Sequence, residues 1–261
     1  MKKTLSMILL AAMLLALPAC SGGKPQDVEL TVFAAASMTE TMTEIKTAYE
    51  KDHPGVTITY NFDSSGTLLT QIKEGAECDL FISAAPKQMS ELDEAGSLAE
   101  GSRIDLLENK VVLCVPERNR AGIESFDGMA AALQSGDIML AMGNSDVPVG
   151  QYTQKIFAYY GLNEEEIAAN GCITYGSNVK EVTTQVGEAS VDCGVIYCTD
   201  AFSAGLTVVD SATAEMCGQV IYPASVLKDS KNVETAQAFL DYLTGDAAMA
   251  VFEGVGFSPA G

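Results

Sequence analysis

The stretch VFAAASMTE, residues 32–40, joins a predicted strand over residues 28–36 to a predicted helix. Four small residues, Ala34 to Ser37, separate the two, and no charged side chain stands among them. Ser37 and Glu40 have the S-x-x-E spacing of a capping box, which predicts Ser37 as the N-cap of the helix. The first N–H groups of a helix lack intrahelical acceptors and also bind anions. The turn therefore has two interpretations, a helix cap and an anion site.

The same alternation of strand and helix continues along the chain. Strands are predicted at 56–62, 78–84, 110–117, 137–143, 172–175, 191–198, 206–210 and 219–228, with helices between most of them and a last helix over 233–243. Repeated strand–helix units predict an α/β fold whose sheets carry helices on both faces and bind ligands at the carboxyl ends of strands. No Pro/Gly-rich linker divides the chain, so the strands KVVLCVP (110–116) and QVIYPASV (219–226) are predicted to cross between domains.

Composition narrows the class of protein. The 261 residues allow one large domain or two modest ones, and 48% of them are apolar, which is enough for a core. Acidic residues number 35 against 15 basic ones. This balance argues against nucleic-acid binding and against an electrostatic membrane patch. A bound anion would have to be held by local groups, against the field of the whole chain.

The N-terminus MKKTLSMILLAAMLLALPAC, residues 1–20, reads as a targeting segment. Two lysines precede an apolar run over residues 7–17 that is too short to span a bilayer. The run ends in a sequence that resembles a bacterial lipobox and closes on Cys20. We therefore expect a signal peptide over 1–19, lipidation of Cys20, and an anchor and tether over 20–27. The alternative is an ordinary secretory signal followed by a chance cysteine.

Other candidate chemistry in the chain is weak. The remaining cysteines are even in number, which permits disulfides outside the cytoplasm, and their pairing stays open: Cys78, Cys114, Cys172, Cys193, Cys198 and Cys217. We expect most of them to be buried small hydrophobes and no metal to be bound, because no Cys/His spacing suggests a metal site. Cys193 and Cys198 are predicted on one strand, roughly 16 Å apart and too far to bridge. The sequence gives no positive sign of an enzyme, since Walker, GxGxxG and HExxH motifs are absent.

Three more helix starts follow predicted strands in the way that Ser37 does. They are Ser64-Ser65-Gly66-Thr67, VPVGQY at 147–152 and GSNVKE at 176–181. Each supplies free amides or hydroxyls just past the carboxyl end of a strand, although capping alone also explains the serine pair. Together they predict an oxyanion cage of neutral donors, whereas a phosphate-transfer site would also need Lys, Arg or a metal.

Four motifs resemble, in order and spacing, the molybdate-binding proteins of ABC importers. They are VFAAASMTE, NFDSSGTLLTQIKEGAECDLFISAA (61–85), VPVGQYTQKI (147–156) and GVIYCTDA (194–201), and the likeness runs from Val28 to Phe257. The resemblance implies a two-lobed periplasmic-binding-protein-like α/β fold, each lobe a mixed sheet flanked by helices, with the ligand cleft between the lobes. Residues 28–115 and 220–261 would form the first lobe and residues 116–219 the second.

The resemblance also implies the ligand contacts. Ser37 and Ser65 would bind molybdate or tungstate through hydroxyl and amide, Val149 and Val179 through their amides, and Tyr197 through its phenol. The metal would be present only inside the oxyanion, with no protein ligand and no further cofactor. The expected partner is an ABC permease, reached by a lipid-anchored monomer.

Two alternatives remain at this stage. One is a binding protein for sulfate or another small anion, and the other is an extracytoplasmic enzyme that uses a cysteine or paired carboxylates. A cage of neutral donors selects by size and by full deprotonation, because a protonated oxygen inside it would find no acceptor.

Overall fold

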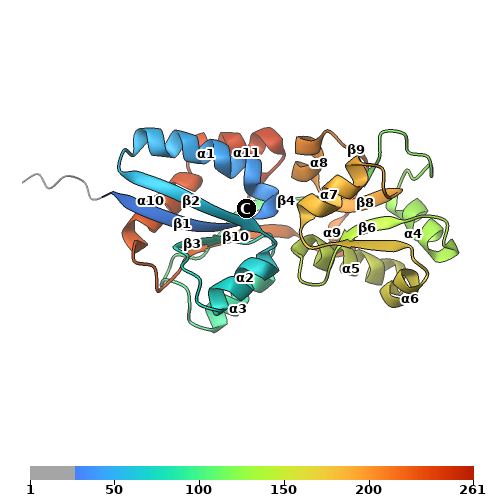
Figure 1. The fold of residues 1–261 in the computed structure, drawn as a ribbon, viewed down its shortest axis with the longest axis horizontal. Helices are drawn as coiled ribbons and strands as arrows, with labels where there is room; N and C mark the ends of the chain where they lie inside the picture. The colour runs from blue at the N-terminus through green and yellow to red at the C-terminus, as the bar shows by residue number, and fades with distance from the viewer. Residues whose placement is uncertain (1–26) are drawn as a thin grey trace, which may run out of the picture.

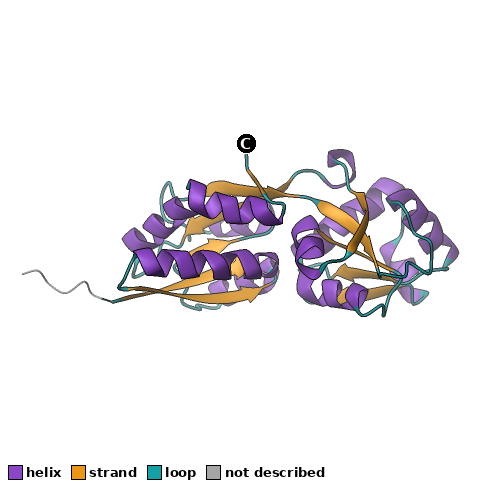
Figure 2. Ribbon diagram, turned by 90° about the horizontal axis from the view of Figure 1, so that it is seen from above, coloured by secondary structure: helices purple, strands orange, loops and turns teal. Residues whose placement is uncertain are grey.

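The computed structural model describes residues 27–261, which form two lobes side by side, each built on its own sheet (Figures 1 and 2). The predicted signal peptide, Cys20 and most of the predicted tether lie outside the described residues. Among the described residues, no helix is long and apolar enough to cross a membrane. The predicted α/β fold with two lobes, each a mixed sheet flanked by helices, is confirmed.

Lobe one contains a six-stranded sheet in the order β11-β4-β10-β3-β1-β2. Its strands are β1 (Val28–Ala35), β2 (Val56–Asp63), β3 (Leu80–Ile82), β4 (Ile104–Asn109), β10 (Val220–Val226) and β11 (Ser258–Pro259). Its helices are α1 (Thr39–Asp52), α2 (Ser65–Lys73), α3 (Pro86–Glu94), α10 (Val233–Leu243) and α11 (Asp246–Val255). Strand β1 runs parallel to β2 and β3, and β10 runs antiparallel to β3 and β4. Helices α1 and α11 lie on one side of the sheet and α2 and α3 on the other (Figure 1).

Lobe two contains a five-stranded sheet in the order β7-β6-β8-β5-β9. Its strands are β5 (Val111–Val115), β6 (Leu140–Gly143), β7 (Ile173–Gly176), β8 (Cys193–Tyr197) and β9 (Thr207–Ser211). Its helices are α4 (Phe126–Ser135), α5 (Pro148–Tyr160), α6 (Glu164–Ala169), α7 (Val179–Gly187), α8 (Cys198–Ala204) and α9 (Ala214–Cys217). Strand β6 is parallel to β7 and β8, whereas β5 is antiparallel to β8 and β9.

The first crossing between the lobes lies earlier than the sequence predicted. Strand β5 pairs with β8 and β9 in lobe two, so the predicted end of the first lobe at residue 115 is wrong. The chain leaves lobe one at Asn109, the last residue of β4, and enters lobe two through Lys110. All five residues of β5 are buried, and a strand buried on both faces shows no alternation that assigns it to one sheet.

The cysteines fit one expectation and contradict another. All six in the described residues are free, and five of them are buried, as small apolar side chains would be. Cys193 begins β8, but Cys198 is the first residue of α8, so the prediction that both lie on one strand is wrong. The strand ends at Tyr197, which is the N-cap of the following helix.

Candidate functional site

The five residues predicted to bind a ligand line one small cavity between the lobes. The space between its lining residues is about 200 Å³ with open solvent included, and little of it is wide enough for a water molecule. The lining residues are Ala35, Ala36, Ser37, Asp63, Ser64, Ser65, Ala84, Val147, Pro148, Val149, Val179 and Tyr197. Lobe one supplies residues at or just after the ends of β1, β2 and β3, and lobe two supplies helix starts and the end of β8. The carboxyl ends of strands from both sheets therefore meet at this cavity.

Ser37 is not the helix cap that its spacing suggested. It lies in the short 3-10 turn Ala36–Met38, and the N-cap of α1 is Met38, which makes no side-chain capping bond. The turn delays the start of α1 and takes Ser37 out of the capping position. The buried Ser37 Oγ instead lies 2.9 Å from the phenol oxygen of Tyr222. The capping-box prediction is wrong, and the hydroxyl faces a polar partner inside the protein.

The serine pair at α2 divides its two possible roles between neighbours. Ser64 is the N-cap, and its Oγ accepts a hydrogen bond from the Thr67 N–H at 3.1 Å. Ser65 is the first residue of the helix and is fully buried. Its Oγ accepts from the Ala84 N–H at 2.9 Å. A hydroxyl that accepts in this way still has one proton to donate.

Val149 and Val179 occupy the starts of α5 and α7. Val149 is the second residue of α5, after Pro148, and Val179 is the first residue of α7. Both side chains are buried. The Asn178 side chain caps α7 by accepting from the Glu181 N–H at 3.1 Å. Amides at these first positions have no intrahelical acceptor, so each valine brings an N–H to the cavity wall.

Tyr197 completes the wall at the end of β8. Its side chain is only 1% exposed, and its phenol oxygen lies 3.5 Å from the Ala84 carbonyl oxygen. Burial, together with the neighbouring Tyr222 and Tyr152, raises the pKa of Tyr197 well above its ordinary value. The phenol therefore stays protonated and serves as a hydrogen-bond donor.

The electrostatics of the cavity come from dipoles. Asp63 is the single charged residue among those that line it, and its Oδ1 accepts from the Ser64 N–H at 2.7 Å. That bond ties the carboxylate to its own turn. Helix N-termini carry a partial positive charge, and several of them reach this cavity. The arrangement suits a small ligand that accepts hydrogen bonds and carries negative charge.

Besides the contact of Tyr197 with Ala84, two further contacts between the lobes lie near the cavity. A Cβ placed on Gly66, the second residue of α2, would lie 2.2 Å from the backbone oxygen of Asp146 in lobe two. Elsewhere, the Lys180 Nζ of α7 lies 2.8 Å from a Glu40 carboxylate oxygen of α1 and 3.1 Å from the Asp200 Oδ1 of α8. A direct backbone approach and an ion pair thus join the two lobes.

Sequence reasoning missed two residues behind Ser37. Tyr222, in β10, is fully buried and contacts the Ser37 hydroxyl. Asn109, at the end of β4, donates from Nδ2 to the Tyr222 oxygen at 3.1 Å. Tyr222 lies 185 positions from Ser37 and 113 from Asn109. Only the strand order of the sheet brings them together, and no local motif indicates that order.

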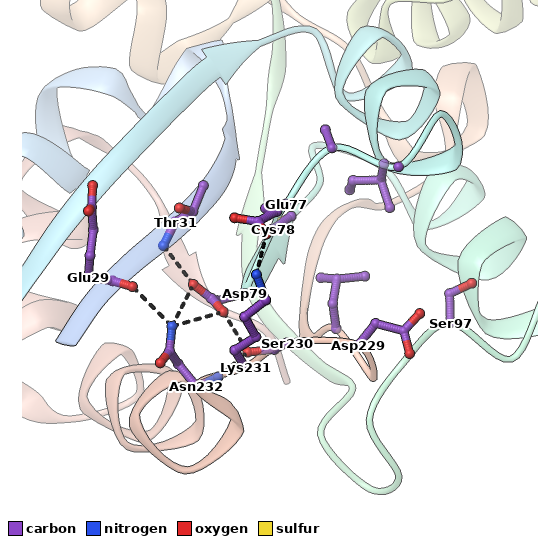
Figure 3. Close-up of a pocket in the computed structure, with 14 residues that line it drawn as sticks. Glu29, Thr31, Glu77, Cys78, Asp79, Ser97, Asp229, Ser230, Lys231 and Asn232 are labelled. Atoms are coloured by element: carbon purple, nitrogen blue, oxygen red, sulfur yellow. Dashed lines mark hydrogen bonds and ion pairs between the residues drawn. The ribbon is translucent and has the colours of Figure 1, made fainter.

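A larger cavity of about 1030 Å³, solvent included, lies against lobe one and shares no residue with the first (Figure 3). Its buried carboxylate, Asp79, accepts from the Thr31 N–H at 2.8 Å and from the Ser230 Oγ at 2.6 Å. Asp79 thereby joins the start of β3 to β1 and to the turn before α10. These bonds give it a structural role, and the smaller cavity remains the candidate site.

Comparison with known proteins assigns the family. A model of the family described as "Bacterial extracellular solute-binding protein" matches residues 30–258. The chain belongs to this solute-binding protein family. It is 38% identical over 234 residues, 89% of this chain and 87% of the other, to the "Putative ABC transporter substrate-binding lipoprotein YvgL" of Bacillus subtilis (strain 168). It is 33% identical over 239 residues to the "Molybdate-binding protein ModA" of Escherichia coli (strain K12), covering 88% of this chain and 89% of that one.

A solved structure supports the same assignment. The "substrate binding domain of putative molybdenum ABC transporter from Clostridium difficile" shares 31% sequence identity and superposes with a TM-score of 0.66. The match covers 89% of this chain and 99% of that chain. In this solute-binding protein the cavity between the lobes is therefore the natural place for the solute.

Proposed function

We propose that this protein binds molybdate outside the cytoplasm and delivers it to an ABC permease. The observation that carries the proposal is the meeting of Ser37, Ser65, Val149, Val179 and Tyr197 at one cavity between the lobes. Each of the five brings a neutral N–H or O–H to the wall. The molybdate-binding relatives support the choice of ligand.

The chemistry of the donors favours a tetrahedral oxyanion without protons. Molybdate and tungstate accept hydrogen bonds at all four oxygens and donate none. A phosphate that carries a proton would place its O–H against further donors, and the unmade hydrogen bond would cost about 1–3 kcal/mol. The absence of Lys and Arg from the lining prevents other anions from being held by charge alone. Tungstate is included in the proposal because it presents the same acceptors.

The location of the protein is part of the proposal. Cleavage before Cys20 and lipidation of its thiol would anchor a monomer to the cell membrane beside its permease. The lipobox-like sequence supports this, and so does the name of the relative YvgL, which is called a lipoprotein. We expect mass spectrometry of membrane-extracted protein to find a lipid-modified Cys20 at the N-terminus. An intact Met1 would contradict the anchor.

Calorimetric titration of the ligand-free protein tests the function. Molybdate and tungstate should bind with a stoichiometry of one, and sulfate and phosphate should bind far more weakly. A Ser37→Ala, Ser65→Ala double variant tests whether binding depends on the two hydroxyls. Its ligand-free thermal melt should match that of wild type, and it should lose most of the affinity. Tighter binding of sulfate than of molybdate would favour the sulfate-binding alternative. No binding of any oxyanion would overturn the proposal.

A further inference from the structure

Behind Ser37 lies a chain of buried hydrogen bonds that leads to the crossing between the lobes. The Ser37 Oγ and the Tyr222 phenol oxygen are 2.9 Å apart, and the Asn109 Nδ2 is 3.1 Å from that same phenol oxygen. All three residues are buried, with Asn109 only 3% exposed. Asn109 is also the last residue of β4, next to Lys110, where the chain enters lobe two.

The orientation of the Asn109 amide follows from its partners. Its Oδ1 accepts from the Lys110 N–H at 2.7 Å, and a backbone N–H can only donate. The Cys198 Sγ donates to the same oxygen at 3.1 Å. The two protons on Nδ2 therefore point the other way, one to the Thr199 Oγ1 at 3.1 Å and one to Tyr222. All four hydrogen-bonding positions of this side chain are in use.

Tyr222 has two neighbouring hydroxyls, that of Ser37 at 2.9 Å and the phenol of Tyr197, and the bond to Ser37 decides where the Tyr222 proton points when an oxyanion is bound. Burial raises the pKa of Tyr222 well above its ordinary value, so the phenol is protonated. Its oxygen already receives a proton from Asn109. An oxyanion without protons can only accept, so the Ser37 proton points to it. The bond between Ser37 and Tyr222 must then use the Tyr222 proton, with the Ser37 Oγ as acceptor.

We propose that Tyr222 and Asn109 are positioning residues that turn the Ser37 hydroxyl proton toward the bound oxyanion. The inference rests on the proposed function and deepens it. Ser65 is arranged in the same manner, because its Oγ accepts from the Ala84 N–H and its proton is left for the cavity. In both serines the protein occupies the acceptor side of the hydroxyl and leaves the donor side to the ligand.

The opposite direction of the hydrogen bond between Ser37 and Tyr222 predicts a different change in affinity when the phenol oxygen is removed. If Ser37 donated to Tyr222 in the bound state, the phenol would compete with the oxyanion for one proton. Removal of the phenol oxygen would then leave affinity unchanged or increase it. If Tyr222 donates to Ser37, removal of the phenol oxygen lets the Ser37 hydroxyl rotate freely and leaves its buried oxygen without a donor. Affinity should then fall by about three- to tenfold, the range of one neutral hydrogen bond.

A double-mutant cycle with calorimetric molybdate titration separates the two arrangements. The variants are Tyr222→Phe, Ser37→Ala and the pair together, each first checked by a ligand-free thermal melt. Tyr222→Phe should weaken binding in the wild-type background and have almost no effect when Ser37 is already alanine. Tyr49→Phe is the matched control, because Tyr49 is a buried tyrosine of α1 that packs against Phe239 and Tyr242 and does not line the cavity. It should leave affinity unchanged.

Each outcome decides the inference. Unchanged or higher affinity in Tyr222→Phe overturns it, and so does an equal loss in both backgrounds, which would indicate packing alone. If Tyr222→Phe does not fold, Asn109→Ala replaces it in the same cycle, because it removes the donor that directs the phenol proton. Wild-type protein that binds no oxyanion would instead refute the proposed function, so the two failures are distinguishable.

Discussion

At the scale of single residues, Ser64 and Ser65 show how adjacent identical side chains acquire different roles. Ser64 caps α2 by accepting from the Thr67 N–H, while Ser65 points into the protein and accepts from the Ala84 N–H. Capping and ligand binding were alternatives for the serine pair in the sequence. In the structure Ser64 is the N-cap, and Ser65 does not cap the helix.

Alanine substitutions of the two serines should therefore have different effects. Ser64→Ala should lower the free energy of unfolding by about 1 kcal/mol, the usual cost of a lost N-cap. Ser65→Ala should weaken molybdate binding roughly ten- to a hundredfold, because a hydrogen bond to a charged group contributes about 1.5–3 kcal/mol. Ligand-free thermal melts and calorimetry on both variants provide the check. Equal losses of stability and affinity in the two variants would contradict this division.

At the scale of secondary-structure elements, the site is assembled from helix starts. Helices α5 and α7 each begin just after a strand and bring an amide to the cavity. An amide is present in every residue except proline, so the side chains of Val149 and Val179 have little to do with donation. This explains how apolar residues serve an anion site, and it makes the backbone itself open to test.

Proline at position 179 removes the donor while keeping the helix. Val179 is the first residue of α7, where proline is well tolerated, and Asn178 before it is extended, with φ −153° and ψ 172°. Val179→Pro should weaken molybdate binding roughly tenfold or more, whereas Val179→Ala should change it little. Calorimetry on the matched pair, with circular dichroism to confirm the helix content, tests this. Similar affinities for the two variants would exclude the amide as a ligand.

Most of the secondary-structure elements and five residues of the candidate site could be predicted from the sequence. Alternating apolar patterns located most strands and helices, and the resemblance named five residues that share one cavity. Strands β4 and β11 and helices α8, α9 and α11 were not predicted, and β5 was assigned to the wrong lobe. Burial on both faces removes the alternation that would distinguish one sheet from another. Tyr222 and Asn109 were not predicted as site residues for a related reason, since only the order of strands in the sheet places them behind Ser37.

At the scale of the whole molecule, one buried carboxylate lies beside the ion pair that joins the lobes. Asp200 has a side chain with no exposed surface, and its Oδ1 is 3.1 Å from the Lys180 Nζ. Burial raises the pKa of Asp200 to about 6, although Lys180 acts in the opposite direction. For Lys180 burial lowers the pKa, but the Asp200 and Glu40 carboxylates raise it by more.

Stability should therefore depend on pH through Asp200. The ordinary pKa of aspartate is 3.8, so the folded protein takes up this proton at higher pH than the unfolded chain does. The stabilisation is complete below about pH 4 and is lost as the pH rises through about 6. The melting temperature of Asp200→Asn minus that of wild type should therefore increase by roughly 5 °C as the pH is raised from 4 to 7.

Thermal melts at several pH values on ligand-free protein measure this difference. Asp52→Asn, a change at an exposed aspartate at the end of α1, is the control and should follow the wild-type pH profile. A constant difference between Asp200→Asn and wild type across this range would contradict the prediction. Lys180 keeps its contact with Glu40 in the variant, so the ion pair between the lobes is preserved.

The approach of Gly66 to the Asp146 backbone oxygen has a consequence for how far the lobes can close. Backbone meets backbone there, and neither side has a flexible chain end that could move aside. The closest separation of the two lobes at this point is thus set by van der Waals contact between backbone atoms. An anion smaller than the space left between the lobes would not reach the donors of both lobes, and a larger anion would keep the lobes from closing fully. A single methyl group at position 66 would widen that space and reset the size of anion that fits it.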